Sequence, residues 1–81
     1  MSTLAVELHA QARNVEFTDI SISVELLDGR TISAPLVWFP KLSAASNSQR
    51  KNWELMGDGE GIHWPDIDED LSVAGLLAGS H

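Results

Sequence analysis

Residues 20–34, which read ISISVELLDGRTISA, decide the fold. From Ile20 to Leu26, apolar side chains occupy every second position and alternate with polar ones. That period is typical of a β-strand with one buried and one solvated face. Asp28 and Gly29 follow directly, and this dipeptide is the strongest short-range signal for a hairpin. The stretch therefore predicts two antiparallel strands joined by a tight turn.

The length of the hairpin loop follows from which side chains must share a face. Residues directly opposite one another in an antiparallel pair lie on the same face. A two-residue loop of Asp28 and Gly29 would place each apolar residue opposite a polar one, which is a one-residue slip. A loop that also includes Leu27 pairs Val24 with Ile32. We predict this three-residue loop, in which glycine supplies the left-handed conformation.

The rest of the chain predicts a second hairpin and several short helices, which together indicate an α+β fold. We expect a small antiparallel sheet built from two hairpins, with about five strands and with two or three short helices covering it. Residues 1–11 are expected to form a flexible N-terminal segment, and residues 12–79 a single domain. The other predicted elements are a first strand at 15–18, helical turns at 40–45 and 47–52, strands near 53–56 and 61–64, an acidic connector at 66–70 and a helix at 72–78.

Length and composition exclude several classes of protein. A chain of 81 residues has room for one small domain, and its lack of cysteine excludes a disulfide scaffold, a thiolate metal site and a cysteine nucleophile. No apolar run is long enough for a membrane helix, and no basic flank with an apolar run marks a signal peptide. We therefore expect a cytoplasmic protein without a cofactor, a metal ion or a membrane partner.

The formal net charge of −7 is confined to one part of the chain. Residues 1–51 carry equal numbers of acidic and basic side chains, whereas residues 52–81 carry seven acids and no lysine or arginine. An acidic surface argues against direct nucleic-acid binding, although less strongly for the neutral part. It favours a basic protein partner. The alternative interpretation is a solvated edge that keeps a small protein soluble.

His63 is the one histidine placed within a predicted element, and Asp66 and Asp68 follow it closely. Together these three side chains suggest an acid–base or metal site. A metal site normally needs three or four protein ligands in a fixed geometry. The competing interpretation is a half-exposed strand histidine that is hydrogen-bonded to a neighbouring carboxylate.

The tryptophans are the most informative side chains, because large aromatics dominate both cores and interface hot spots. Three occur, Trp38, Trp53 and Trp64, while tyrosine is absent. The apolar run at 36–39 is longer than one amphipathic face can hide, so part of it is a candidate for contact with a partner or a second copy. The alternative is that these side chains serve the core alone.

Three stretches carry a resemblance to a known family. They read LDGRTIS at 27–33, PLVWFPKL at 35–42 and GDGEGIHWPDIDEDLSV at 57–73. With these motifs, the chain resembles the bacterial family catalogued as domain of unknown function 2442. The resemblance implies a small α+β fold without established catalytic residues or cofactor. Members are often encoded beside another small protein, in an arrangement that resembles a toxin–antitoxin pair. Some relatives add a helix-turn-helix domain, which we do not expect here.

These observations predict a non-enzymatic interaction module, an antitoxin-like partner of a small basic protein encoded nearby. One alternative is a small enzyme or metal-binding protein that uses His63 with Asp66 or Asp68. Another is a structural homodimer that buries the run at 36–39. No catalytic, metal or cofactor residues are assigned. The candidate partner-contact residues are Trp38, Phe39, His63, Trp64, Asp66, Asp68, Glu69 and Asp70.

Overall fold

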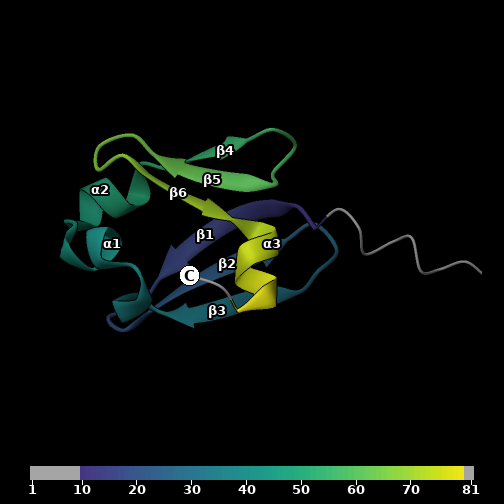
Figure 1. Cartoon of the computed structure of the whole chain (residues 1–81), viewed down its shortest axis with the longest axis horizontal. Helices are drawn as coiled ribbons and strands as arrows, with labels where there is room; N and C mark the ends of the chain where they lie inside the picture. The colour runs from purple at the N-terminus through teal and green to yellow at the C-terminus, as the bar shows by residue number, and fades with distance from the viewer. Residues whose placement is uncertain (1–9, 80–81) are drawn as a thin grey trace, which may run out of the picture.

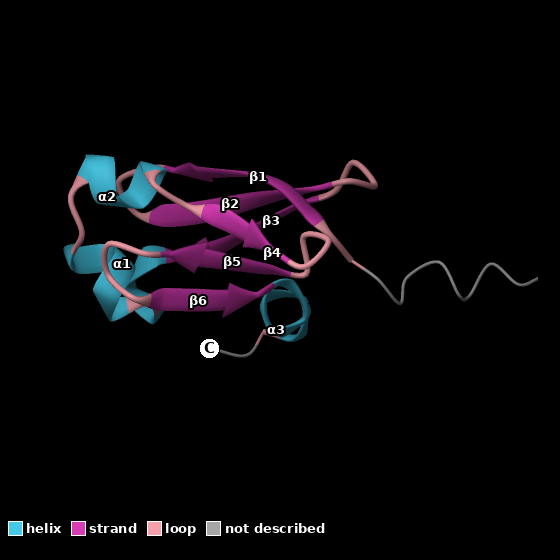
Figure 2. Cartoon of the chain, turned by 90° about the horizontal axis from the view of Figure 1, so that it is seen from above, coloured by secondary structure: helices cyan, strands magenta, loops and turns pink. Residues whose placement is uncertain are grey.

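Two antiparallel three-stranded sheets form the framework of the protein, and the computed structural model describes residues 10–79 (Figure 1). The elements are β1 (Ala12–Phe17), β2 (Ser21–Leu26), β3 (Thr31–Pro35), the 3-10 helix η2 (Leu36–Trp38), α1 (Pro40–Ala44), α2 (Asn47–Lys51), β4 (Glu54–Met56), β5 (Gly61–Trp64), β6 (Glu69–Ser72) and α3 (Val73–Ala78). The first sheet has the order β1-β2-β3 and the second β4-β5-β6. Viewed from above, the second sheet lies over the first (Figure 2). The α+β class is thus confirmed, with two sheets in place of one.

The β2–β3 hairpin has the predicted register. Val24 lies opposite Ile32 in the antiparallel ladder. The amide of Gly29 donates to the carbonyl of Leu26 at 3.1 Å, and the amide of Leu26 donates to the carbonyl of Arg30 at 2.8 Å. Gly29 has a φ of +98°, so the left-handed residue closes a loop of three residues as expected.

A β-bulge in β1 directs the side chains of both Ala12 and Val15 toward the core. Ala12 pairs with Leu26, but the next pair is Asn14 with Glu25, which leaves Arg13 as an extra residue. A bulge shifts the side-chain alternation by one position. As a result Ala12 and Val15 are both buried, although they are three positions apart.

The prediction of an acidic connector at 66–70 is wrong for Glu69 and Asp70, because these two residues begin strand β6. Residues 10–79 accordingly form six strands, where about five were expected. After β5, the amide of Ile67 donates to the carbonyl of Trp64 at 3.4 Å, and Asp68 adopts a left-handed φ of +53°. This tight turn returns the chain along β5 at once. Acidic residues are depleted in strands, so the sequence gives little sign of the element.

The hydrophobic core lies between the two sheets. Buried side chains from β1 and β2 face Ile62 and Trp64 of β5, and Leu42 of α1 is also fully buried. The helices α1 and α2 close one end of the molecule, while α3 contacts both β3 and β6 at its side. No helix within residues 10–79 has the length and apolar character that a membrane crossing requires.

Within residues 10–79 the helices α1, α2 and α3 form where the sequence predicts them, and α2 and α3 have capped ends. The Ser46 hydroxyl accepts from the amide of Gln49, and the Gln49 side chain accepts from the amide of Ser46, which completes a capping box. Ser72 caps α3, and Gly79 ends it with a φ of +80°.

The chain is already fixed to the domain at Gln11. Its carbonyl accepts from the amide of Leu27 at 2.9 Å, and its side-chain amide donates to the carbonyl of Asp58 at 2.7 Å. The flexible segment predicted at 1–11 otherwise lies outside the described residues, apart from Ala10.

Candidate functional site

A cleft of about 350 Å³ lies between the η2–α1 segment and the β6–α3 segment. We call it the acidic cleft, because Glu69 and Asp70 line it together with Trp38 and Phe39, and no lysine or arginine does so. The two segments are about thirty positions apart in the sequence. The remaining lining residues are Pro40, Leu71, Ser72, Gly75 and Leu76. Four of the eight predicted contact residues therefore meet around one depression.

The apolar run at 36–39 divides between the core and the surface. Leu36 and Phe39 are each 3% exposed, because the single turn of η2 directs them inward. Val37 is 76% exposed and Trp38 is 37% exposed. The Trp38 ring packs edge-to-face on Phe39, with 6.4 Å between the ring centroids. Half of the run is thus core and the other half is exposed, with Trp38 on the wall of the acidic cleft.

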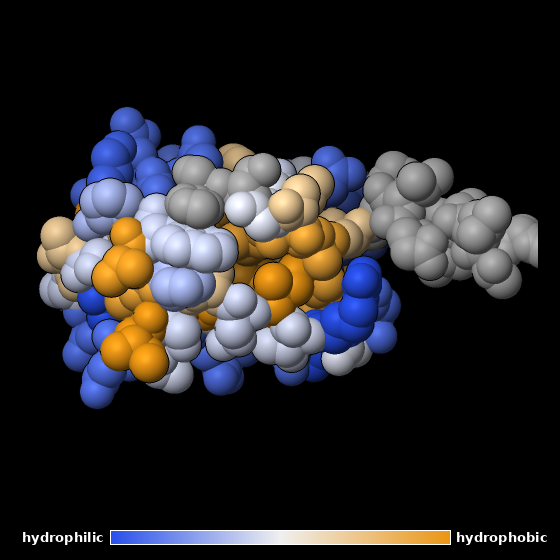
Figure 3. Space-filling model, turned by 60° about the horizontal axis from the view of Figure 1, so that its bottom comes forward, coloured by the Kyte–Doolittle hydropathy of each residue, from blue (hydrophilic) through white to orange (hydrophobic). Residues whose placement is uncertain are grey.

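Further apolar surface lies on the same side of the molecule. Apolar side chains gather in a hollow on the face that carries β3 and α3 (Figure 3). At the η2 end, the amide of Leu36 donates to the carbonyl of Ile20 at 2.8 Å, which places another exposed apolar residue beside Val37. Apolar surface beside a charged cleft is typical of a protein contact.

The acidic turn before β6 is anchored at both ends. The carboxylate of Asp66 accepts a hydrogen bond of 3.1 Å from the side-chain amide of Asn52. The ammonium group of Lys41 donates to the main-chain carbonyl of Asp68 at 3.0 Å. Lys41 therefore contacts the main chain of Asp68, whose side chain is exposed. These contacts hold the turn against α1 and α2.

His63 lies on the outer face of the second sheet, in a row with two carboxylates. It is opposite Asp70 on β6 and Glu54 on β4, and its side chain is 27% exposed. Its Nδ1 atom shares a short hydrogen bond with the carboxylate of Asp70. That bond raises the pKa of His63, against a smaller lowering by partial burial, and the nearby charges of Asp70, Glu54 and Asp68 raise it further. The imidazole thus keeps its proton to a higher pH than a free histidine.

We expect Asp70→Asn to lower the pKa of His63, measured by NMR titration of the ring protons. Glu54→Gln is the matched control and should lower it less, because Glu54 acts only through its charge. In the wild type, the contribution of this pair to the free energy of unfolding is fully present below about pH 6.5 and is lost as the pH rises through the raised folded pKa. An equal effect of the two substitutions would contradict the assigned partner.

The structure pairs His63 with a carboxylate other than the two suggested with it for an acid–base or metal site. His63 pairs with Asp70, and not with Asp66 or Asp68, as a strand histidine bonded to a neighbouring carboxylate. In the part of the chain that the structure describes, no three histidine, aspartate or glutamate side chains are grouped as metal ligands. Trp64 is 0% exposed and belongs to the core, so it offers no surface to a partner in this fold.

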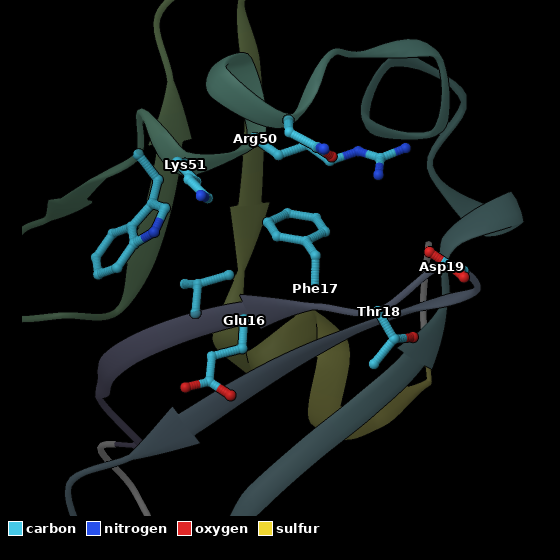
Figure 4. Close-up of a pocket in the computed structure, with 9 residues that line it drawn as sticks. Glu16, Phe17, Thr18, Asp19, Arg50 and Lys51 are labelled. Atoms are coloured by element: carbon cyan, nitrogen blue, oxygen red, sulfur yellow. The ribbon is translucent and has the colours of Figure 1, made fainter.

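A larger cleft, of about 500 Å³, was not foreseen from the sequence (Figure 4). Phe17 and Trp53 line it together with Arg50 and Lys51. Its residues come from β1 and from the segment around α2, and no local pattern connects them. Only packing of the two segments creates the site. The other lining residues are Val15, Glu16, Thr18, Asp19 and Asn47.

Arg50 is the structural centre of that region. Its Nε and Nη2 atoms donate to the carbonyls of Leu42 and Ser43, each at 2.9 Å, and so satisfy carbonyls near the end of α1. The guanidinium carbon lies 5.7 Å from the centroid of the Phe17 ring. The indole Nε1 of Trp64 donates to the main-chain carbonyl of Arg50 at 2.9 Å. These contacts join α1, α2, β1 and β5.

Comparison with known proteins identifies a matching family and similar structures, which are described as uncharacterized or of unknown function. The sequence profile of the family described as "Protein of unknown function (DUF2442)" matches residues 12–81. A crystal structure of a protein of unknown function from Rhodospirillum rubrum is similar, with 33% identity, 88% of each chain covered and a TM-score of 0.74. A solution structure of an uncharacterized protein from Chromobacterium violaceum shares the fold, with 24% identity, 94% of this chain and 71% of the other covered, and a TM-score of 0.74. No curated protein matches the sequence.

Proposed function

We propose that this chain, which belongs to the DUF2442 family, is a non-enzymatic cytoplasmic interaction module whose acidic cleft binds a small basic protein. The observation that supports the proposal is the juxtaposition of Trp38 with Glu69 and Asp70 around one cleft that lacks any basic lining residue. Aromatic side chains beside carboxylates suit a partner segment with a lysine or arginine next to an apolar side chain. The family resemblance adds a candidate, namely the small protein encoded beside such genes.

Electrostatics supports the same class of partner. All seven acids beyond residue 51 belong to the part of the chain that includes the second sheet and its turns. Concentration of one sign of charge accelerates encounter with a partner of the opposite sign, and the effect weakens as salt is added. An antitoxin-like role follows from this complementarity, because a tightly bound acidic module would mask the basic surface of its partner.

Co-expression with the neighbouring small protein, followed by size-exclusion chromatography at low salt, tests the proposal. We expect a single co-eluting peak for the wild type, and binding about tenfold weaker for Glu69→Gln, as expected for loss of one charge contact of about 1.4 kcal/mol. The matched control is Asp58→Asn, which removes the same charge from the exposed β4–β5 loop. Two separate peaks for the wild type, or equal weakening by both substitutions, would contradict the proposal.

A further inference from the structure

The outer edge of β1 carries main-chain groups that no strand of residues 10–79 pairs with. In the sheet order β1-β2-β3, β1 is an edge strand. The amide of Thr18 donates to the carbonyl of Ser21 across the β1–β2 turn at 2.9 Å. Hydrogen-bonded pairs alternate along an antiparallel ladder, so Phe17 and Val15 occupy the pairs that do not bond to β2. Their amide and carbonyl groups therefore point outward from the sheet.

The other edges lack such a stretch. β3 ends with Pro35, which has no amide proton, and α3 contacts this strand. β4 has only three residues, and β6, the other edge of the second sheet, has four and is contacted by α3. At the start of β1, the amide of Ala12 already donates to the carbonyl of Gly59 at 2.7 Å. The segment from Val15 to Phe17 is thus the place where an added strand can bond.

The cleft of about 500 Å³ lies directly beside this edge. Phe17 extends from β1 toward α2, whereas Glu16 points to the opposite side of the strand (Figure 4). Arg50 and Lys51 stand over the cleft from α2, and neither forms an ion pair with a carboxylate within residues 10–79. Asp19 lies at the far end, in the β1–β2 turn. The side that faces an incoming strand is therefore aromatic and basic.

We propose that the edge of β1 binds an extended peptide segment of another protein by strand addition. The segment carries a large apolar side chain that enters between Phe17 and Trp53, and a carboxylate two positions away that meets Lys51. Alternate residues of a strand point to the same side, so both side chains face the cleft while the main chain bonds to Val15 and Phe17. Added strands obtain affinity from these main-chain bonds and specificity from the alternate side chains.

A second copy of the chain does not meet this requirement through its own β1. The side chains of β1 that face the cleft are Val15 and Phe17, and neither is a carboxylate. The site also shares no lining residue with the acidic cleft, and its lining includes the basic side chains of Arg50 and Lys51. The peptide-binding inference therefore goes beyond the proposed function, and either can fail without the other.

The test uses the full chain labelled with 15N and the probe peptide acetyl-Ser-Leu-Thr-Glu-Val-Ser-amide. We expect the largest shifts at the main-chain amides of Val15 and Phe17 and at the indole of Trp53. Replacing the glutamate of the peptide by lysine, or methylating the amide nitrogen of its leucine, should abolish those shifts. On the protein, Lys51→Glu should weaken binding about tenfold. Lys41→Glu, the same substitution at a residue that does not line this cleft, should not weaken it.

Several results would overturn the inference. One is the absence of shifts at Val15 and Phe17 up to the solubility limit of the peptide. Another is equal binding of the glutamate and lysine peptides, because the basic side chains would then select nothing. Concentration-dependent shifts at the same amides without peptide would show that a second copy occupies the edge. Shifts centred on Trp38 would assign the peptide to the acidic cleft instead.

Discussion

Gly59→Ala should destabilise the protein by about 3 kcal/mol or more, because it combines backbone strain with a collision that the main chain cannot avoid. Gly59 is buried and has a φ of +94°. A Cβ atom there would lie 2.7 Å from the carbonyl oxygen of Ala12 and 3.1 Å from its amide nitrogen. The same Ala12 amide donates to the Gly59 carbonyl at 2.7 Å. The substitution therefore separates the β4–β5 loop from the start of β1.

Gly29→Ala is the matched control for this prediction. Gly29 has a similar φ of +98°, but no heavy atom lies within 4 Å of its added Cβ. We expect a loss of about 1–2 kcal/mol from the left-handed backbone alone. Urea unfolding followed by circular dichroism measures both variants on the same scale. Equal losses of unfolding free energy in the two variants would show that the close contact between residue 59 and Ala12 does not affect stability.

Local signals predicted local structure well. The β2–β3 hairpin follows from its own alternation and turn residues, so its register was correct at Val24 and Ile32. The capping box of α2 is likewise encoded within the four residues from Ser46 to Gln49. Such features depend on neighbours in the sequence, and packing against the rest of the molecule does not alter them.

Features that depend on long-range packing were not predicted. Alternation along a strand cannot show which sheet the strand joins. The sequence therefore predicts one sheet, whereas the structure has two. The hairpin predicted from strands near 53–56 and 61–64 is confirmed, but the docking of its glycine-rich loop on Ala12 was not foreseen. β6 was missed because Glu69 and Asp70 are poor strand formers, although Leu71 and Val73 continue an apolar alternation. The sequence did contain one signal for β6, because Pro65 directly after Trp64 indicates a turn that can return the chain along β5.

The candidate site was predicted as a set of residues and not as a geometry. Trp38, Glu69 and Asp70 were named because aromatic and acidic side chains suit a basic partner, and the structure brings them to one cleft. Trp64 was named for the same reason, yet it is fully buried. Composition cannot separate a core tryptophan from a surface one, since both functions favour the same large apolar ring.

Trp64→Ala should cost about 4 kcal/mol, the largest loss that we expect from a single side-chain truncation in this protein. Trp64 is 0% exposed, and its ring meets Phe17 edge-to-face with 6.3 Å between the centroids. Its indole also donates to the carbonyl of Arg50. Truncation leaves a cavity between the sheets and removes a hydrogen bond from a part-buried carbonyl.

Two further variants keep this prediction testable, because a domain of this size has only about 4–12 kcal/mol of stability and the alanine variant risks unfolding. Trp64→Phe keeps most of the ring but loses the donor to Arg50, so we expect a folded protein that is about 2 kcal/mol less stable. Trp38→Ala is the matched control on the surface and should cost at most about 1.5 kcal/mol, since this side chain is 37% exposed. Urea unfolding ranks the three. If Trp38→Ala lowered the stability as much as Trp64→Ala, Trp38 would also serve the core. It could then not be treated as an aromatic contact of the acidic cleft that is available to a partner.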